Sequence, residues 1–119
     1  MEQTNLYSER IHELVISTAN ACVRYCPYLK TISVPENLES LDLEGSGIER
    51  LPELPETLDY LNISKTNIKT MPNIKNVRFL LADDLRFANR NTPIRLPWES
   101  GYQYAERMRR WQIAHQETS

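Results

Sequence analysis

The chain has 119 residues, 40% of them hydrophobic and 25% charged, with a formal net charge of −2 at pH 7. This length and composition predict one globular domain and exclude a disordered chain. A charge so close to neutral also argues against a general binder of polyanions.

No apolar run approaches the ~20 residues that a membrane span needs. Residues 1–10 lack the basic flank and the apolar stretch of a cleaved secretion signal. We therefore expect no membrane association and a cytoplasmic location where the protein is made. Secretion into a host cell by a signal that is not cleaved is the alternative.

Residues 4–20 form the first predicted element. Side chains that can line one helical face recur at Tyr7, Ile11, Leu14, Val15 and Thr18. Such spacing gives a single apolar stripe along a helix, and Thr4 is a residue type that caps a helix N-terminus. The sequence predicts a capping helix within residues 1–20.

The middle of the chain repeats with a period of twenty residues. Leu38, Leu41, Leu43, Ile48 and Leu51 recur as Leu58, Leu61, Ile63, Ile68 and Met71. A third unit aligns through Val77, Leu80 and Ala82 if one residue is dropped before Val77. A fixed period of this length is typical of a solenoid, whose units bury their apolar faces against their neighbours.

Residues 21–26 match the repeat less well and indicate a degenerate leading strand. Shifted by twenty, Ala21 and Val23 fall on inward-facing strand positions, and Tyr28 falls on the position of Ile48. At the turn after each strand, Asn67 is expected to bond free backbone groups through its amide, with Gly47 as its equivalent. The prolines suit an extended return segment, because proline cannot donate a hydrogen bond to a strand ladder.

The end of the chain breaks the repeat. Residues 85–97 are expected to form a capping loop, after which Ser100 and Gln103 predict a capping box at the start of a helix. The apolar stripe of that helix is Tyr104, Ala105, Met108 and Trp111. The prediction is a single α/β domain, residues 1–119: a small solenoid of three to four short parallel strands (21–84) between an N-terminal helix (1–20) and a C-terminal cap and helix (85–119).

The Leu-x-x-Leu-x-Leu pattern, with Leu-Pro-Glu-Leu-Pro-Glu at residues 51–56, resembles the leucine-rich repeat over residues 31–83. It is most similar to the short twenty-residue, Leu-Pro-rich type known from bacterial effectors, some of which carry a ubiquitin ligase domain. This chain has only two good repeats and no room for such a domain, and a small protein of this kind could come from a bacterium or a phage. The resemblance implies strands on a concave face that binds a partner protein.

Strand alternation places a second set of side chains on the concave face. They form three columns: Ser40, Tyr60 and Phe79; Asp42, Asn62 and Leu81; Glu44, Ser64 and Asp83. Asn20, Cys22 and Arg24 extend the rows on the degenerate strand. We expect Tyr60, Phe79 and Leu81 to anchor a partner within a polar rim of Asp42, Glu44, Asn62, Ser64 and Asp83. The alternative is that the C-terminal cap covers Phe79 and Leu81 as ordinary core.

Nothing in the sequence forms a catalytic constellation, so we expect no enzyme and no cofactor. Asp83 and Asp84 are adjacent in a strand and would point to opposite faces. Cys22, Cys26 and His12 are too few for tetrahedral zinc, so no metal is expected and the cysteines are interpreted as packing residues. Cys26, beside Pro27, is the one that a loop position could leave partly exposed.

Charge is unevenly spread along the chain. Residues 1–84 carry 8 Lys and Arg against 13 Asp and Glu, a net of −5, whereas residues 85–119 carry 6 Arg against 3 Glu, a net of +3. Arg107, Arg109 and Arg110 beside Trp111 are the best feature for nucleic acid, but the acidic repeats argue against it. Pairing of these arginines with the repeats of a second copy would instead give a homodimer in place of a monomer.

The function that we predict is a protein–protein interaction module that binds a partner through its concave face as an effector or inhibitor. Two alternatives stay open. One is the substrate-adaptor arm of an enzyme assembly of the ubiquitin-ligase kind, and the other is a structural protein that associates with itself.

Overall fold

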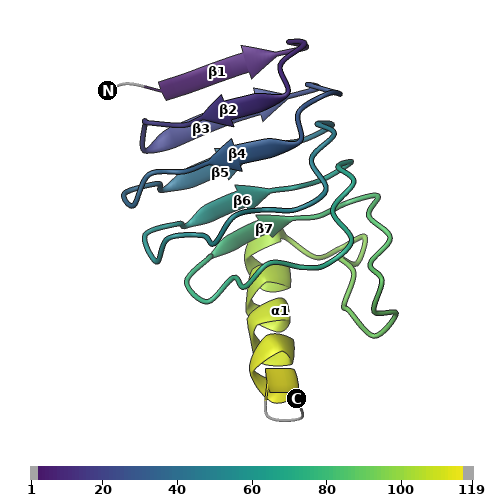
Figure 1. Ribbon diagram of the computed structural model, residues 1–119. Helices are drawn as coiled ribbons and strands as arrows, with labels where there is room; N and C mark the ends of the chain where they lie inside the picture. The colour runs from purple at the N-terminus through teal and green to yellow at the C-terminus, as the bar shows by residue number, and fades with distance from the viewer. Residues whose placement is uncertain (1–2, 117–119) are drawn as a thin grey trace.

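The computed structural model describes residues 3–116 and shows a stack of short turns of chain, each contributing one strand to a common parallel sheet (Figure 1). The sheet has five strands in the order β1-β3-β5-β6-β7. They are β1 (Gln3–Tyr7), β3 (Asn20–Arg24), β5 (Ser40–Asp42), β6 (Tyr60–Asn62) and β7 (Phe79–Leu81). A second parallel pair, β2 (Glu13–Val15) with β4 (Thr31–Ser33), forms part of the opposite layer.

The strand register follows the sequence repeat. Leu41 pairs with Leu61, and Leu61 pairs with Leu80, so the last step is nineteen residues, as the dropped residue predicts. All three side chains are fully buried between the two layers. The predicted parallel solenoid is confirmed, and the degenerate strand is too, because Ala21 pairs with Leu41 and is buried.

The prediction of an N-terminal helix is wrong. Residues 3–7 form strand β1 and residues 13–15 form strand β2, so this segment is one more turn of the solenoid. Between the two strands Ser8 has a left-handed φ of 57°, which a right-handed helix cannot accommodate. The sequence repeat does not reveal this turn, because β1 pairs with β3 at an offset of seventeen residues, Gln3 with Asn20. The other strands of the main sheet pair at offsets of twenty or nineteen residues.

Two expectations for the leading turn are also corrected. Tyr28 is 51% exposed, and Leu29 occupies the inward position instead, with its N–H bonded to the carbonyl oxygen of Cys26 at 3.2 Å. Cys26 is fully buried and is therefore not a partly exposed thiol. The turn contains one more residue before its apolar side chain than the units that follow.

The turn position that carries buried hydrogen bonds lies one residue before Asn67. The side chain of Asn67 does donate to the carbonyl oxygen of Gly47 at 3.4 Å, but this residue is exposed. Thr66 is buried and donates from its hydroxyl to the carbonyl oxygen of Ile63 at 2.7 Å. Its equivalents at intervals of twenty are Ser46 and Cys26, both buried.

Helix α1 (Gly101–Gln116) closes the C-terminal end of the stack and packs against β7 (Figure 1). The predicted capping box is confirmed: the Gln103 N–H donates to the Ser100 hydroxyl at 3.2 Å, and the Ser100 N–H donates to the Gln103 side-chain oxygen at 2.9 Å. Tyr104, Ala105 and Met108 are fully buried, as the predicted stripe requires.

Candidate protein-binding surface

The register of the main sheet places the predicted columns side by side on its outer face, which is the face turned away from the buried core and the one predicted to be the concave binding face. Ser40, Tyr60 and Phe79 lie in one row, and Asp42, Asn62 and Leu81 lie in the next. Each row crosses β5, β6 and β7 at right angles to the strands. The sheet is thus a platform on which residues nineteen or twenty positions apart become direct neighbours.

Three aromatic rings gather at the C-terminal end of this platform. Tyr60 and Phe79 stack with ring centroids 5.0 Å apart and planes 8° apart. Tyr102 of α1 meets Phe79 edge-on at 4.8 Å. Phe79 and Tyr60 are partly buried, whereas Tyr102 is 64% exposed. We call Tyr60, Phe79 and Tyr102 the aromatic cluster.

The aromatic cluster depends on a close approach between α1 and β7. A Cβ atom on Gly101 would lie 2.7 Å from the ring of Phe79, so a larger residue would push the helix or the ring away. The helix therefore covers Phe79 in part, and both Phe79 and Leu81 stay partly accessible. Tyr102 was not among the predicted residues because it lies off the apolar stripe of the helix.

Asp42 and Asn62 have mainly internal contacts. They are only 6% and 2% exposed. Asp42 accepts from the Arg24 guanidinium, with its Oδ2 2.5 Å from Nη2 and 3.0 Å from Nε. Its Oδ1 accepts the N–H of Glu44 at 3.1 Å, and Asn62 in the same way accepts the N–H of Ser64 at 3.0 Å. These two side chains hold the turn at the end of each strand.

Glu44 lies at the edge of the platform in a network of donors. It accepts from the Tyr25 hydroxyl at 2.9 Å and from the Asn62 amide at 3.3 Å, with Arg24 at 3.9 Å. The hydrogen bond from Tyr25 is the main reason that the pKa of Glu44 is lowered, so this carboxylate keeps its charge. Burial, with a smaller contribution from Asp42, raises the pKa of Tyr60, which keeps that hydroxyl neutral.

In the same column as Glu44, after strand β7, Asp83 and Arg95 form an ion pair. Two nitrogens of Arg95 donate to the carboxylate at 2.9 and 3.0 Å, and the Asp83 N–H donates to the hydroxyl of buried Ser64. Of the eight predicted residues, the structure therefore leaves Tyr60, Phe79, Leu81, Glu44 and Asp83 at least partly accessible. Aromatic rings that share a face with carboxylates suit the recognition of a protein surface.

The arginines of α1 are held by contacts within the chain. Arg107 pairs with Glu99 at 2.8 Å, and Arg110 pairs with Glu106 at 2.6 Å. Arg109 donates to the backbone carbonyl of Val77. Arg109 thus ties the helix to the last repeat and Arg107 ties it to the loop before the helix, whereas the pair of Arg110 with Glu106 lies within the helix.

Two features are absent from residues 3–116. No group of three or more histidine, cysteine, aspartate or glutamate residues there is placed to hold a metal ion. Within the same range, α1 has neither the length nor the apolar character to cross a bilayer.

Comparison with known proteins shows a similarity to a plant protein. The chain is 36% identical over 61 residues to the Disease resistance protein RRS1 of Arabidopsis thaliana, and several curated sequences under that name match equally. The match covers 50% of this chain but only 4–5% of those much longer relatives. No family model matches, and no solved structure matches.

A parallel solenoid of about four turns, similar over half of its length to part of a resistance protein, fits a leucine-rich-repeat region. Solenoids of this kind generally bind other proteins. The fold and the similarity together indicate a protein-interaction module.

Proposed function

We propose that this protein captures a partner protein on the outer face of its main sheet and acts as an effector or inhibitor. The observation that best supports this proposal is the aromatic cluster, which presents three rings near charged residues on the main sheet. The proposal treats the chain as a binding module rather than an enzyme. Similarity to a fragment of a resistance protein is consistent with this role.

The cluster has the chemistry of a binding hot spot. Tyrosine and phenylalanine rings bury a large area while losing few rotatable bonds, and the stack of Tyr60 on Phe79 already fixes both rings. Glu44 and Asp83 lie past the C-terminal ends of β5 and β7 and would set the orientation of the partner. Truncating a central aromatic residue in such a patch costs about 2 kcal/mol or more of binding free energy.

The test is affinity capture from lysates of candidate producer and host cells, read by mass spectrometry. Wild type is compared with the Tyr60→Ala/Tyr102→Ala variant and with a control, Tyr28→Ala, which removes an exposed tyrosine from a turn outside the platform. We expect a stoichiometric protein to be retained by wild type and by the control, and lost with the double variant. Equal retention by all three proteins, at unchanged thermal stability, would refute binding at the aromatic cluster.

A further inference from the structure

The layer opposite the main sheet changes character along the stack. Its first two turns pair as β2 and β4, with Leu14 opposite Ile32. One repeat later, the position of Ile32 is taken by Pro52, which has no N–H to continue the ladder. In the part of the chain that the structure describes, no hydrogen bond joins residues 49–56 to residues 69–76.

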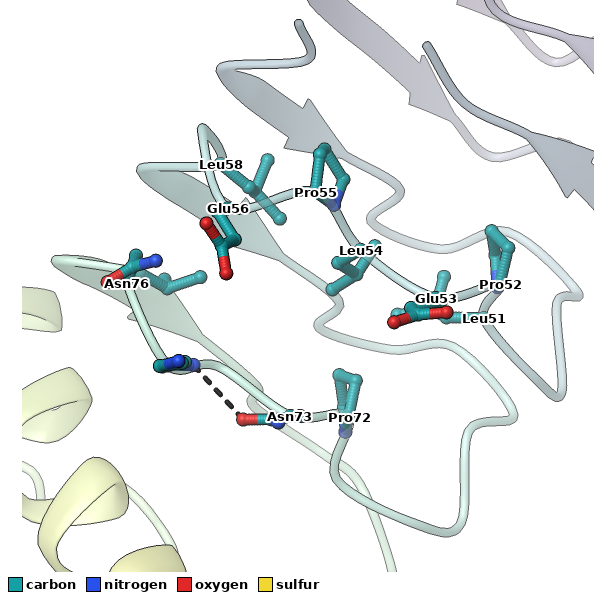
Figure 2. A pocket seen from close by; sticks show the side chains of 12 residues that line it. Leu51, Pro52, Glu53, Leu54, Pro55, Glu56, Leu58, Pro72, Asn73 and Asn76 are labelled. Carbon is teal, nitrogen blue, oxygen red and sulfur yellow. Dashed lines mark hydrogen bonds between the residues drawn. The ribbon is translucent and has the colours of Figure 1, made fainter. Parts of the chain in front are cut away.

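A groove of about 460 Å³ opens where this pairing stops. Figure 2 shows it between two extended segments, residues 51–56 on one rim and residues 72–77 on the other. Half of the residues that line it are leucine or proline, and most of the others are polar: Leu51, Pro52, Glu53, Leu54, Pro55, Glu56, Leu58, Pro72, Asn73, Lys75, Asn76 and Val77. We call it the return groove.

Both rims are fixed by the rest of the fold. Gln112 of α1 donates to the carbonyl oxygen of Pro72 at 2.8 Å and accepts the N–H of Ile74 at 3.2 Å. On the other rim, Thr57 donates to the carbonyl oxygen of Leu38 at 2.7 Å, and the Leu58 N–H bonds that of Pro55 at 3.2 Å. The groove is therefore preformed, which lowers the entropic cost of filling it.

The first rim has a period of three. In Leu51 to Glu56 the order Leu-Pro-Glu occurs twice, and both leucines and both prolines are half-buried while both glutamates are exposed. Glu53 lies in the irregular segment 51–55, and Glu56 lies at the start of the turn that the Leu58 N–H closes onto Pro55. Three residues of extended chain span about 9–10 Å, which sets the spacing of the two glutamates along the rim. In Figure 2 their carboxylates extend over the space between the rims.

The carboxylates of Glu53 and Glu56 are not engaged by other side chains of the described residues. Neither Glu53 nor Glu56 makes an ion pair or a side-chain hydrogen bond within residues 3–116. Lys75 is the one cation that lines the groove, on the opposite rim. The groove thus combines a preformed apolar floor with an excess of negative charge at a defined spacing.

We propose that the return groove binds an extended, basic segment of a partner protein, in which cationic residues recur every third position. The cations would pair with Glu53 and Glu56, and an aliphatic residue between them would lie on Leu54 and Pro55. A partner segment in a polyproline-type conformation repeats every 9 Å or so, which matches the spacing of the two glutamates along the rim. This surface lies in the layer opposite the aromatic cluster and is independent of it.

The probe is a fluorescein-labelled peptide of Lys-Pro-Leu repeated three times, titrated with the full chain and read by fluorescence polarisation. We expect saturable binding to wild type and a 2- to 30-fold weaker Kd for Glu53→Gln/Glu56→Gln, the range for two exposed ion pairs. Lys75→Gln, which removes the competing cation, should tighten binding. A peptide with glutamine in place of each lysine should lose affinity in wild type.

The matched control is Glu36→Gln/Glu49→Gln, which removes the same charge from exposed glutamates that do not line the groove. We expect its Kd to stay within twofold of wild type. Equal weakening by both double variants would reduce the effect to general attraction by an acidic surface and overturn the proposal. Absence of saturable peptide binding to wild type would also overturn the proposal. So would light scattering in which the mass of wild type rises with concentration while the Glu53→Gln/Glu56→Gln variant stays monomeric. The occupant of the groove would then be a second copy of this chain.

Discussion

Ser46 joins two successive turns of the solenoid through a single buried hydroxyl. This oxygen donates to the carbonyl oxygen of Val23 at 2.9 Å and accepts the N–H of Cys26 at 3.2 Å. The residue is 1% exposed, so water cannot replace either bond. The backbone of one turn is thereby held by the side chain of the next.

Replacing Ser46 with alanine should destabilise the protein by about 1–3 kcal/mol, the cost of leaving a buried donor without its partner. The volume removed is a single oxygen, so a cavity contributes little. The N–H of Cys26 has no other hydrogen-bond acceptor among the described residues, which is why the unpaired group sets the magnitude.

Urea denaturation followed by circular dichroism measures this loss. With a slope of about 1–2 kcal/mol per molar urea, a loss of 2 kcal/mol lowers the midpoint by about 1–2 M. Ser46→Thr is the matched control because it keeps the hydroxyl, and Ser17→Ala controls for removal of an exposed serine. If Ser46→Ala unfolds within about 0.3 M of wild type, or Ser46→Thr falls as far as Ser46→Ala, the hydroxyl bridge is not the cause.

Two further predictions concern the turns and the cap. Gly47→Ala should cost about 1–3 kcal/mol in the same urea assay, because its Cβ would lie 2.1 Å from the carbonyl oxygen of Pro27, a backbone atom that cannot rotate away; an unchanged midpoint would show that the turn can open. The ion pair with Arg107 lowers the pKa of Glu99, so its contribution to stability is full above the ordinary carboxyl pKa of about 4.3 and is lost as pH falls through the lower folded value. Glu99→Gln should therefore reduce stability at pH 7 and flatten its dependence on pH between about 5 and 3, and an equally steep dependence in the variant would assign it to other carboxylates.

The strands of the solenoid were predictable because their inward residues repeat in the sequence. Leu41, Leu61 and Leu80 each need the same depth of burial, and burial constrains residue type more strongly than any other requirement of the fold. The first turn was not predictable by the same route. Its offset of seventeen hides it from a search at twenty, and five side chains at helical spacing gave a false amphipathic pattern.

The predicted bond from the Asn67 amide to the backbone of Gly47 is present, but the sequence pattern missed the buried donors one position earlier. Asn67 was predicted because an amide can bond backbone groups, whereas the preceding position, which is buried in three successive turns, carries Cys26, Ser46 and Thr66. These three residues have in common only a small side chain that carries a hydrogen-bond donor, a thiol or a hydroxyl. The hydroxyl or thiol satisfies local backbone groups as an amide would, so the chemical role is kept while the expected residue type is absent.

The columns of the platform followed from strand alternation, but their accessibility did not. Asp42 is hidden by Arg24, which comes from the neighbouring strand eighteen residues earlier. Likewise, the aromatic cluster is completed by Tyr102, from a helix outside the repeat. Alternation fixes the direction of a side chain, whereas its exposure depends on partners that the local pattern does not contain.

Helix α1 also makes contacts that its own sequence pattern does not predict. Tyr102 contacts Phe79 on the platform, and Gln112, ten residues and about 15 Å further along, holds the rim of the return groove. Both lie outside the apolar stripe from which the helix was predicted. An apolar stripe identifies the side chains that a helix buries, whereas the residues beside the stripe determine which other surfaces the helix contacts. In this protein those flanking residues connect one rigid element to the two surfaces for which we propose binding.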